Sequence, residues 1–100
     1  MNEQELENKI NEKGLNAPRL TPDHIDSSIR ETHFLLLPGT TTTVCYLILQ
    51  NGHTVVGTSA CVSPENFNSE IGEQIALKNA QEKIWELEGY LLNQRLYEQA

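Results

Sequence analysis

The sequence has few basic residues. Its 100 residues include 7 Lys and Arg against 14 Asp and Glu, which gives a net charge of -7 at neutral pH. The basic residues are dispersed along the chain, whereas neutralising phosphates requires a basic patch or stripe. We therefore predict that the protein does not bind nucleic acid directly. The alternative interpretation of this negative charge is an acidic surface that mimics DNA and binds to a DNA-binding protein.

The sequence also lacks a long apolar run. No stretch is long enough to span a bilayer, and the polar N-terminus does not resemble a signal peptide. We therefore expect no membrane partner and an intracellular protein. The length predicts one domain, residues 1–100, with a modest core, and residues 1–16 are expected to form a mobile N-terminal segment.

Cysteine is scarce, with only 2 residues. Together with His24, His33 and His53 they supply the ligand types of a zinc site, but without the close paired spacing that structural zinc sites show. Free cysteines acting as small hydrophobic residues are the simpler interpretation. We predict no metal and no cofactor. Since no nucleophile, base and orienting group can be named together, we also predict that the protein is not an enzyme.

Two short helices are expected before the first strand. The first lies within residues 1–16 and stops at Gly14, and Ala17-Pro18 breaks the chain after it. The second begins at Thr21 and Pro22, which have the order of a helix cap followed by proline. Ile25 and Ile29 would anchor its apolar side.

The period of apolar residues changes from about residue 32. An apolar run at residues 33–37 ends at Pro38-Gly39, which suits the centre of a type II turn. Residues 40–50 are rich in β-branched and aromatic side chains, Asn51-Gly52 is a strong hairpin signal, and residues 54–62 return as a third strand. The segment predicts a three-stranded antiparallel β-meander.

A two-residue loop at Asn51-Gly52 would pair residues whose numbers sum to 103. One face would then carry Cys45, Leu47, Leu49, Thr54, Val56 and Thr58, and the other Tyr46, Ile48, Val55 and Cys61. Cys45 and Cys61 would point to opposite sides, so a disulfide between them is not expected. Because both faces carry apolar side chains, neither is expected to be wholly solvated. The long helix would cover one face. The other face would be covered by the N-terminal segment, by another subunit or by a ligand.

The stretch from Ser63 to the C-terminus predicts a long amphipathic helix. Ser63-Pro64 is a helix-start signature, and Ser69 is a second candidate cap. A short turn over residues 64–67 could precede the helix. One face is formed by residues spaced three and four apart: Ala76, Ala80, Ile84, Leu87 and Leu91. We predict an α+β fold in which short N-terminal helices precede the meander and the long C-terminal helix packs on the sheet.

This helix would be longer than its own domain. From about Ser69 to about Tyr97 it would extend about 40 Å, whereas a compact domain of this size has a radius of gyration of roughly 13 Å. Its last turns would need a cover, and a second copy is the simplest one. We predict a homo-oligomer, a dimer or larger, with an interface formed by Trp85, Tyr90, Leu92 and Leu96. Trp85 could equally close the core.

The junction between the third strand and the long helix is the candidate binding site. It contains Ser63, Glu65, Asn66 and Phe67, where the free amides of a helix start can hold an anion. The alternative is that Ser63 and Asn66 only cap and Phe67 only packs. Basic residues that could supply charge to an anionic ligand include Arg30, Lys78 and Lys83.

Three stretches of the chain resemble a known family. They are APRLTPDHIDSSI, NGHTVVGTSACVSPENFNSEIGEQIA and NAQEKIWELEGYLL. They are similar to small accessory proteins of tailed phages and prophages, the gene product forty-nine/sixty-six family. The resemblance covers Ala17 to about Leu92, and SACVSPENF is its most specific string. Since this family has no settled activity, the resemblance implies a phage context, and the cytoplasm of the bacterial host as location, but no catalytic residues.

Small acidic phage proteins without enzymatic motifs commonly act by binding. The resemblance therefore implies a non-catalytic accessory protein, and we expect a host protein as its first partner, in host takeover or counter-defence. The alternative is a sponge for an anionic small signalling molecule, such as a cyclic nucleotide, at a subunit interface near the junction. A small enzyme is the third interpretation.

Overall fold

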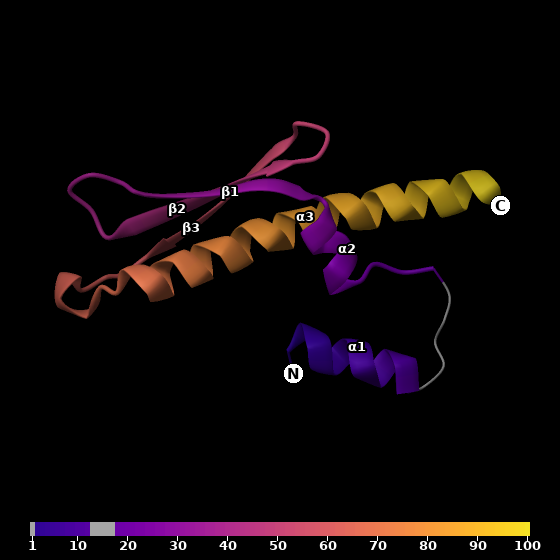
Figure 1. Cartoon of the computed structure of the whole chain (residues 1–100), viewed down its shortest axis with the longest axis horizontal. Coiled ribbons are helices and arrows are strands. Elements are labelled where there is room, and N and C mark those ends of the chain that lie inside the picture. Colours follow the sequence, from indigo (N-terminus) through magenta and orange to yellow (C-terminus); the bar gives the residue numbers. More distant parts are fainter. Residues whose placement is uncertain (1, 13–17) are drawn as a thin grey trace.

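The computed structural model describes residues 2–12 and 18–100. It confirms the predicted α+β fold, with short N-terminal helices, a three-stranded antiparallel sheet and a long C-terminal helix on one sheet face (Figure 1). The predicted helix stop at Gly14 and the break at Ala17 lie outside the described residues. The elements are α1 (Glu3–Glu12), α2 (Pro22–Ser27), β1 (Ile29–Leu36), β2 (Thr42–Leu49), β3 (Thr54–Ala60), a 3-10 turn (Pro64–Asn66) and α3 (Ser69–Gln99).

Helix α2 begins as predicted and ends earlier than predicted. The Thr21 hydroxyl accepts a hydrogen bond from the His24 amide at 3.1 Å, and Pro22 occupies the first turn. At the other end the hydroxyls of Ser27 and Ser28 donate back to helix carbonyls, which competes with continuation of the helix. The prediction that Ile29 anchors this helix is therefore wrong, since Ile29 is the first residue of β1.

The sheet has the predicted meander order β1-β2-β3 with antiparallel neighbours. The turn between β1 and β2 has the predicted type, because Gly39 has a φ of +77° and the Thr40 amide donates to the Leu37 carbonyl at 3.1 Å. A register shift lies between Ile29 and Glu31 in β1. From Glu31 onwards β1 therefore pairs regularly with β2.

The predicted register of the β2–β3 hairpin is wrong by one residue. Tyr46 lies opposite Val56 and Leu47 opposite Val55, so paired numbers sum to 102. The loop has three residues rather than two: the Gly52 amide donates to the Leu49 carbonyl at 2.9 Å, and Gly52 has a φ of +89°. A type I turn followed by a glycine in the left-handed region is the usual three-residue hairpin.

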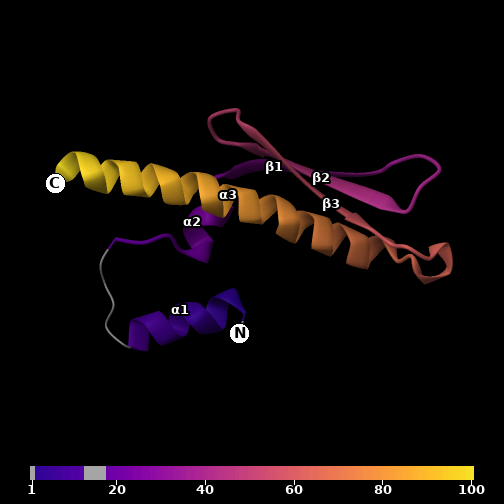
Figure 2. The same cartoon turned by 180° about the vertical axis from the view of Figure 1, so that it is seen from behind.

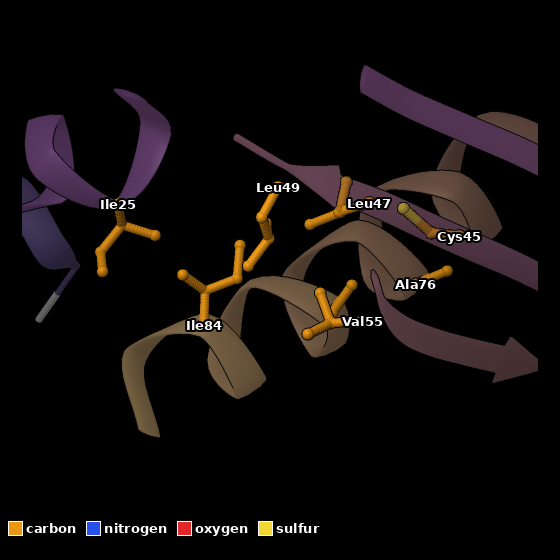
Figure 3. Packing of buried hydrophobic residues seen from close by; sticks show 8 residues of the cluster. Ile25, Cys45, Leu47, Leu49, Val55, Ala76 and Ile84 are labelled. Atoms are coloured by element: carbon orange, nitrogen blue, oxygen red, sulfur yellow. The ribbon is translucent and has the colours of Figure 1, made fainter. Parts of the chain in front are cut away.

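The corrected register separates the two faces of the sheet. A one-residue slip moves side chains of a strand to the other face, so Val55 joins Cys45, Leu47 and Leu49 while Val56 joins Tyr46 and Ile48. The first face is covered by α3, and its residues are buried. The core contains Ile25, Cys45, Leu47, Leu49, Val55, Ala76, Ala80 and Ile84 (Figure 3).

Helix α3 crosses β3 at Gly57 with almost no space between the two backbones. A Cβ atom built on Gly57 would lie 2.3 Å from both the Ala76 carbonyl oxygen and the Ala80 amide nitrogen. The small residues Ala76 and Ala80 on the helix and Gly57 on the strand therefore permit this close approach. The core is thin here and is formed partly by backbone.

The capping residue of α3 differs from the prediction, whereas the start near Ser69 and the length of the helix agree with it. The cap is Asn68, whose side chain accepts a hydrogen bond from the Ile71 amide at 3.1 Å. Ser63 makes no cap hydrogen bond and only precedes the predicted short turn, and Ser69 is already the first helical residue. The 31 residues of α3 correspond to about 46 Å at the usual helical rise.

Helix α3 extends beyond the sheet, as predicted (Figures 1 and 2). The radius of gyration is 16.4 Å and the longest dimension is 52 Å, against roughly 13 Å for a compact domain of this length. Helix α1 lies on the side of α3 away from the sheet, and Glu7 forms an ion pair with Arg19 there. None of the helices in the described part is long and apolar enough to cross a membrane.

Candidate functional site

A pocket of about 180 Å³ opens where β3 leaves the sheet and α3 begins. It contains two of the predicted binding residues, Asn66 and Phe67. The remaining walls come from the start of β2, the end of β3 and the first turns of α3, and they include Thr41, Ser59, Asn68 and Ile71. None of the residues that line the pocket is charged. An aromatic ring, side-chain amides and hydroxyls thus converge on a concave apolar surface, as in many small-molecule sites.

Hydrogen bonds hold the pocket walls in place. The Thr41 hydroxyl donates to the Cys61 carbonyl, which ties the start of β2 to the chain just after β3. The Ser59 hydroxyl donates to the Gly72 carbonyl at 2.6 Å and so fixes the first turn of α3 against β3. The Cys61 thiol donates to the Ser63 carbonyl at 3.1 Å. These bonds join three segments around one opening.

Ser63 and Glu65, the other two predicted junction residues, do not line the pocket. The Ser63 hydroxyl donates to the Glu65 carboxylate at 2.6 Å, and this hydrogen bond lowers the pKa of the Glu65 carboxyl from its usual value. The pair is exposed at the surface of the turn that precedes α3. The sequence pointed to the junction at which this pocket lies, but it did not separate the residues that line the pocket from those that only shape the turn.

The predicted basic residues do not gather at this pocket. Lys78 and Lys83 lie about 14 and 21 Å along α3 from its first residue, at the usual rise per residue. The Lys83 ammonium donates to the Val56 carbonyl on the outer edge of β3. Arg30 lies near the opposite end of the sheet, where Ile29 pairs with Leu49, and forms an ion pair with Glu31 at 3.5 Å. Within one copy, no described basic side chain lines the pocket.

The predicted interface residues occupy different environments. Trp85 is partly buried and packs against the core, which agrees with the interpretation that it closes the core. Tyr90 is 74 % exposed on the overhanging part of α3, and Tyr97 nearby is 76 % exposed. Leu92 is partly buried and Leu96 is more exposed. The overhang therefore presents apolar and aromatic side chains that the described part of the chain leaves open.

Both cysteines are free thiols. Cys45 is fully buried in the core, and this burial, with a smaller contribution from the negative charge of Glu73, raises the pKa of its thiol. Cys61 is only partly buried and lies next to the pocket. In the corrected register the two residues no longer fall on opposite sheet faces. They are still not paired across the hairpin, because Cys45 lies opposite Gly57 and Cys61 follows the end of β3. Among the residues that the structure describes, no group of three or more His, Cys, Asp or Glu could hold a metal ion.

We predict that alkylating reagents distinguish the two thiols. At pH 8 iodoacetamide should label Cys61 at least about tenfold faster than Cys45, because a buried thiol with a raised pKa is both inaccessible and protonated. Peptide mass spectrometry over a time course measures both rates in one sample. After denaturation in urea the two rates should converge, and equal labelling of the native protein would contradict the position of Cys45 in the core.

Comparison with protein families adds to this geometry. Residues 20–96 match the model of the Phage protein (N4 Gp49/phage Sf6 gene 66) family. The chain belongs to this family. The match confirms the resemblance noted from the sequence and covers the sheet, the junction pocket and most of α3, but not α1. No curated protein and no solved structure gives a significant match to the chain.

Proposed function

We propose that this phage protein acts by stoichiometric, non-catalytic binding of an anionic small molecule in the junction pocket. The observation that favours this function over others is the convergence of Phe67, Asn66 and Asn68 on one opening. An aromatic face can stack on a planar heterocycle, and amide side chains can pair with its polar edge. Such a ligand class includes cyclic nucleotides, and the protein would act as a sponge in the cytoplasm of the bacterial host.

The charge of the pocket supports an anionic ligand. In a chain of net charge -7, the pocket is lined by uncharged side chains only. The first turn of α3 forms one wall, and the early amides of a helix carry a partial positive charge. Because Arg30, Lys78 and Lys83 lie elsewhere, further positive charge would have to come from a second copy. This is consistent with a ligand at a subunit interface.

A second candidate is binding to a host protein, which the sequence alone favoured. The supporting observation is the amount of apolar surface outside the pocket. The sheet face turned away from α3 exposes Leu35 and Val56, and the overhang of α3 exposes Tyr90 and Tyr97. Homo-oligomerisation through Trp85, Tyr90, Leu92 and Leu96 would use the same overhang. Exposed aromatic residues are frequent where protein partners meet.

We predict that Phe67→Ala weakens binding of a cyclic nucleotide by about 10- to 100-fold, the usual contribution of base stacking. Asn66→Ala should also weaken it. Glu65→Gln is the matched control, because Glu65 is adjacent in the chain but outside the pocket, and its affinity should stay within about twofold. Isothermal titration calorimetry against a panel of cyclic mononucleotides and dinucleotides measures all four proteins.

Native mass spectrometry of the protein purified from its bacterial host separates the two candidates. A ligand-sized mass increment on the purified protein, lost in Phe67→Ala, supports the sponge. Unchanged affinity in Phe67→Ala would remove the pocket from the function. A bare protein that binds no member of the panel, but copurifies with one host protein in equimolar amount, would establish the second candidate instead.

A further inference from the structure

The two outer edges of the sheet differ in how they are protected. The Leu49 amide donates to the His53 carbonyl, so the odd-numbered residues of β3 bond to β2 and the even-numbered ones face outward. Two of these outward carbonyls are already occupied by α3. The Asn79 side chain donates to Thr58 at 2.8 Å, and the Lys83 ammonium donates to Val56. Helix α3 thereby closes the β3 edge to another strand.

The β1 edge has no such cover. The Leu37 amide donates to the Thr42 carbonyl at 3.0 Å, so the odd-numbered residues of β1 bond to β2. The amides and carbonyls of Thr32, Phe34 and Leu36 therefore face outward. No backbone group of residues 2–12 and 18–100 forms a hydrogen bond with them. One edge of the sheet is closed and the other is open.

The side chains along the β1 edge are unusual for an edge exposed to water. Residues 32–37 contain no charged residue and no proline, which are the common devices that prevent strand addition. Phe34 is 37 % exposed and Leu36 is 48 % exposed, both on the face that carries α3. Helix α3 packs on β2 and β3, so it leaves this part of β1 partly open. The edge is thus apolar as well as unpaired.

The open stretch is symmetric about one residue. It is bounded by the register shift before Glu31 and by the turn that begins at Leu37, and Phe34 lies midway between these limits. We infer that β1 pairs antiparallel with β1 of a second copy about a two-fold axis at Phe34. Thr32 of each copy then faces Leu36 of the other, and the two three-stranded sheets become one continuous sheet.

A second copy fits this edge for three physical reasons. An antiparallel edge is complementary to itself, so one surface serves both partners of a two-fold dimer. The paired strand residues include no Asp, Glu, Lys or Arg, so no like charges face each other between the two strands, and the acidic side chains of Glu70 and Glu73 beside Phe34 belong to α3. Because α3 closes the β3 edge, addition stops at two copies and does not continue into a fibre. No residue of β1 lines the junction pocket, so the inference does not rest on the proposed function.

Leu36→Pro tests the backbone pairing. Proline removes an outward amide that has no partner within the protomer, so the monomer should tolerate it, as edge strands generally do. The dissociation constant of the dimer, measured by sedimentation equilibrium, should rise about a hundredfold. The two-fold axis repeats the substitution, so each dimer loses two backbone hydrogen bonds. Thr54→Pro, at the start of β3 on the closed edge, is the matched control and should dimerise like the wild type. Circular dichroism confirms that each variant is folded.

Phe34→Cys tests the register without disturbing the edge backbone. The background is Cys45→Ala with Cys61→Ser, because Cys45 lies opposite residue 34 in the same chain and would otherwise compete for the new thiol. Oxidation should then give a covalent dimer, because opposed residues in an antiparallel pair lie within disulfide distance. Leu36→Cys is the matched control and should stay monomeric on a non-reducing gel, since it faces Thr32. A monomeric wild type, a dimer that persists in Leu36→Pro, or the absence of a Phe34→Cys crosslink would each overturn the proposal. If β1 pairs with a strand of another protein instead, the purified wild type would be a monomer, which is the first of these outcomes.

Discussion

Replacing Gly57 with alanine is expected to lower the free energy of unfolding by about 3 kcal/mol or more. The new Cβ would lie 2.3 Å from the Ala76 oxygen and the Ala80 nitrogen and 2.9 Å from the Ala80 Cα. All three are backbone atoms, so no side-chain rotation relieves the overlap and α3 must move away from β3. For a chain of this size the melting temperature should fall by about 12 to 24 °C. Thermal unfolding followed by circular dichroism measures this change.

Gly89→Ala, in α3, is the matched control. Gly89 does not have a positive φ, and the nearest atom to its added Cβ would be a Leu20 methyl carbon at 3.9 Å, an ordinary contact distance. Alanine should therefore raise stability by up to about 1 kcal/mol through helix propensity alone. Equal stability of Gly57→Ala and the wild type would show that α3 does not cross β3 at this point.

Leu47→Ala is expected to cost about 3 kcal/mol, within the usual range for a fully buried leucine. Leu47 is 0 % exposed and lies on the central strand between Thr32 and Val55, under α3. Truncation leaves a cavity that the strand and the helix cannot both close. Urea unfolding monitored by tryptophan fluorescence gives the free energy, and the m-value should stay constant if only the core contact is lost.

Ile48→Ala tests the assignment of the two sheet faces. Ile48 is the next residue of β2 and points to the face away from α3, where its side chain is only partly buried. Its truncation should cost less than half as much as that of Leu47, because less apolar area is removed from the interior. Similar costs at both positions would mean that the second face is buried as well, as it would be if another chain covered it.

Local signals in the sequence were sufficient to predict the helices, the strands and the order in which they follow. The threonine cap and proline predict the start of α2, and Pro38-Gly39 predicts a type II turn, because these preferences depend on a few neighbouring residues. The apolar spacing predicts α3, and Ala76, Ala80 and Ile84 of its predicted face are buried. Leu87 and Leu91 of the same predicted face are 44 % and 40 % exposed. Where two local signals competed, the prediction failed: Asn68 caps α3 although Ser63 and Ser69 are also good caps.

The hairpin shows how a local ambiguity becomes a tertiary error. Asn51-Gly52 suits both a two-residue loop and the last positions of a three-residue loop. The difference of one residue decides whether Val55 or Val56 is buried, since side chains alternate between faces. Gln50 forms part of the loop in the structure, and no property of that residue indicates this. The close fit of Gly57 against α3 depends on the same register.

The sequence by itself determined the order of the elements, the length of α3, its overhang and the family of the protein, because periodicity, capping and motif strings are read along the chain. Only the tertiary structure decided which sheet face α3 covers, which junction residues line the pocket and which sheet edge is open. Asn66 and Phe67 line the pocket with Thr41 and Ser59, whereas Ser63 and Glu65 do not. The physical reason is that these features depend on contacts between residues far apart in the chain, and a shift of one position in strand pairing exchanges the side chains of the two sheet faces.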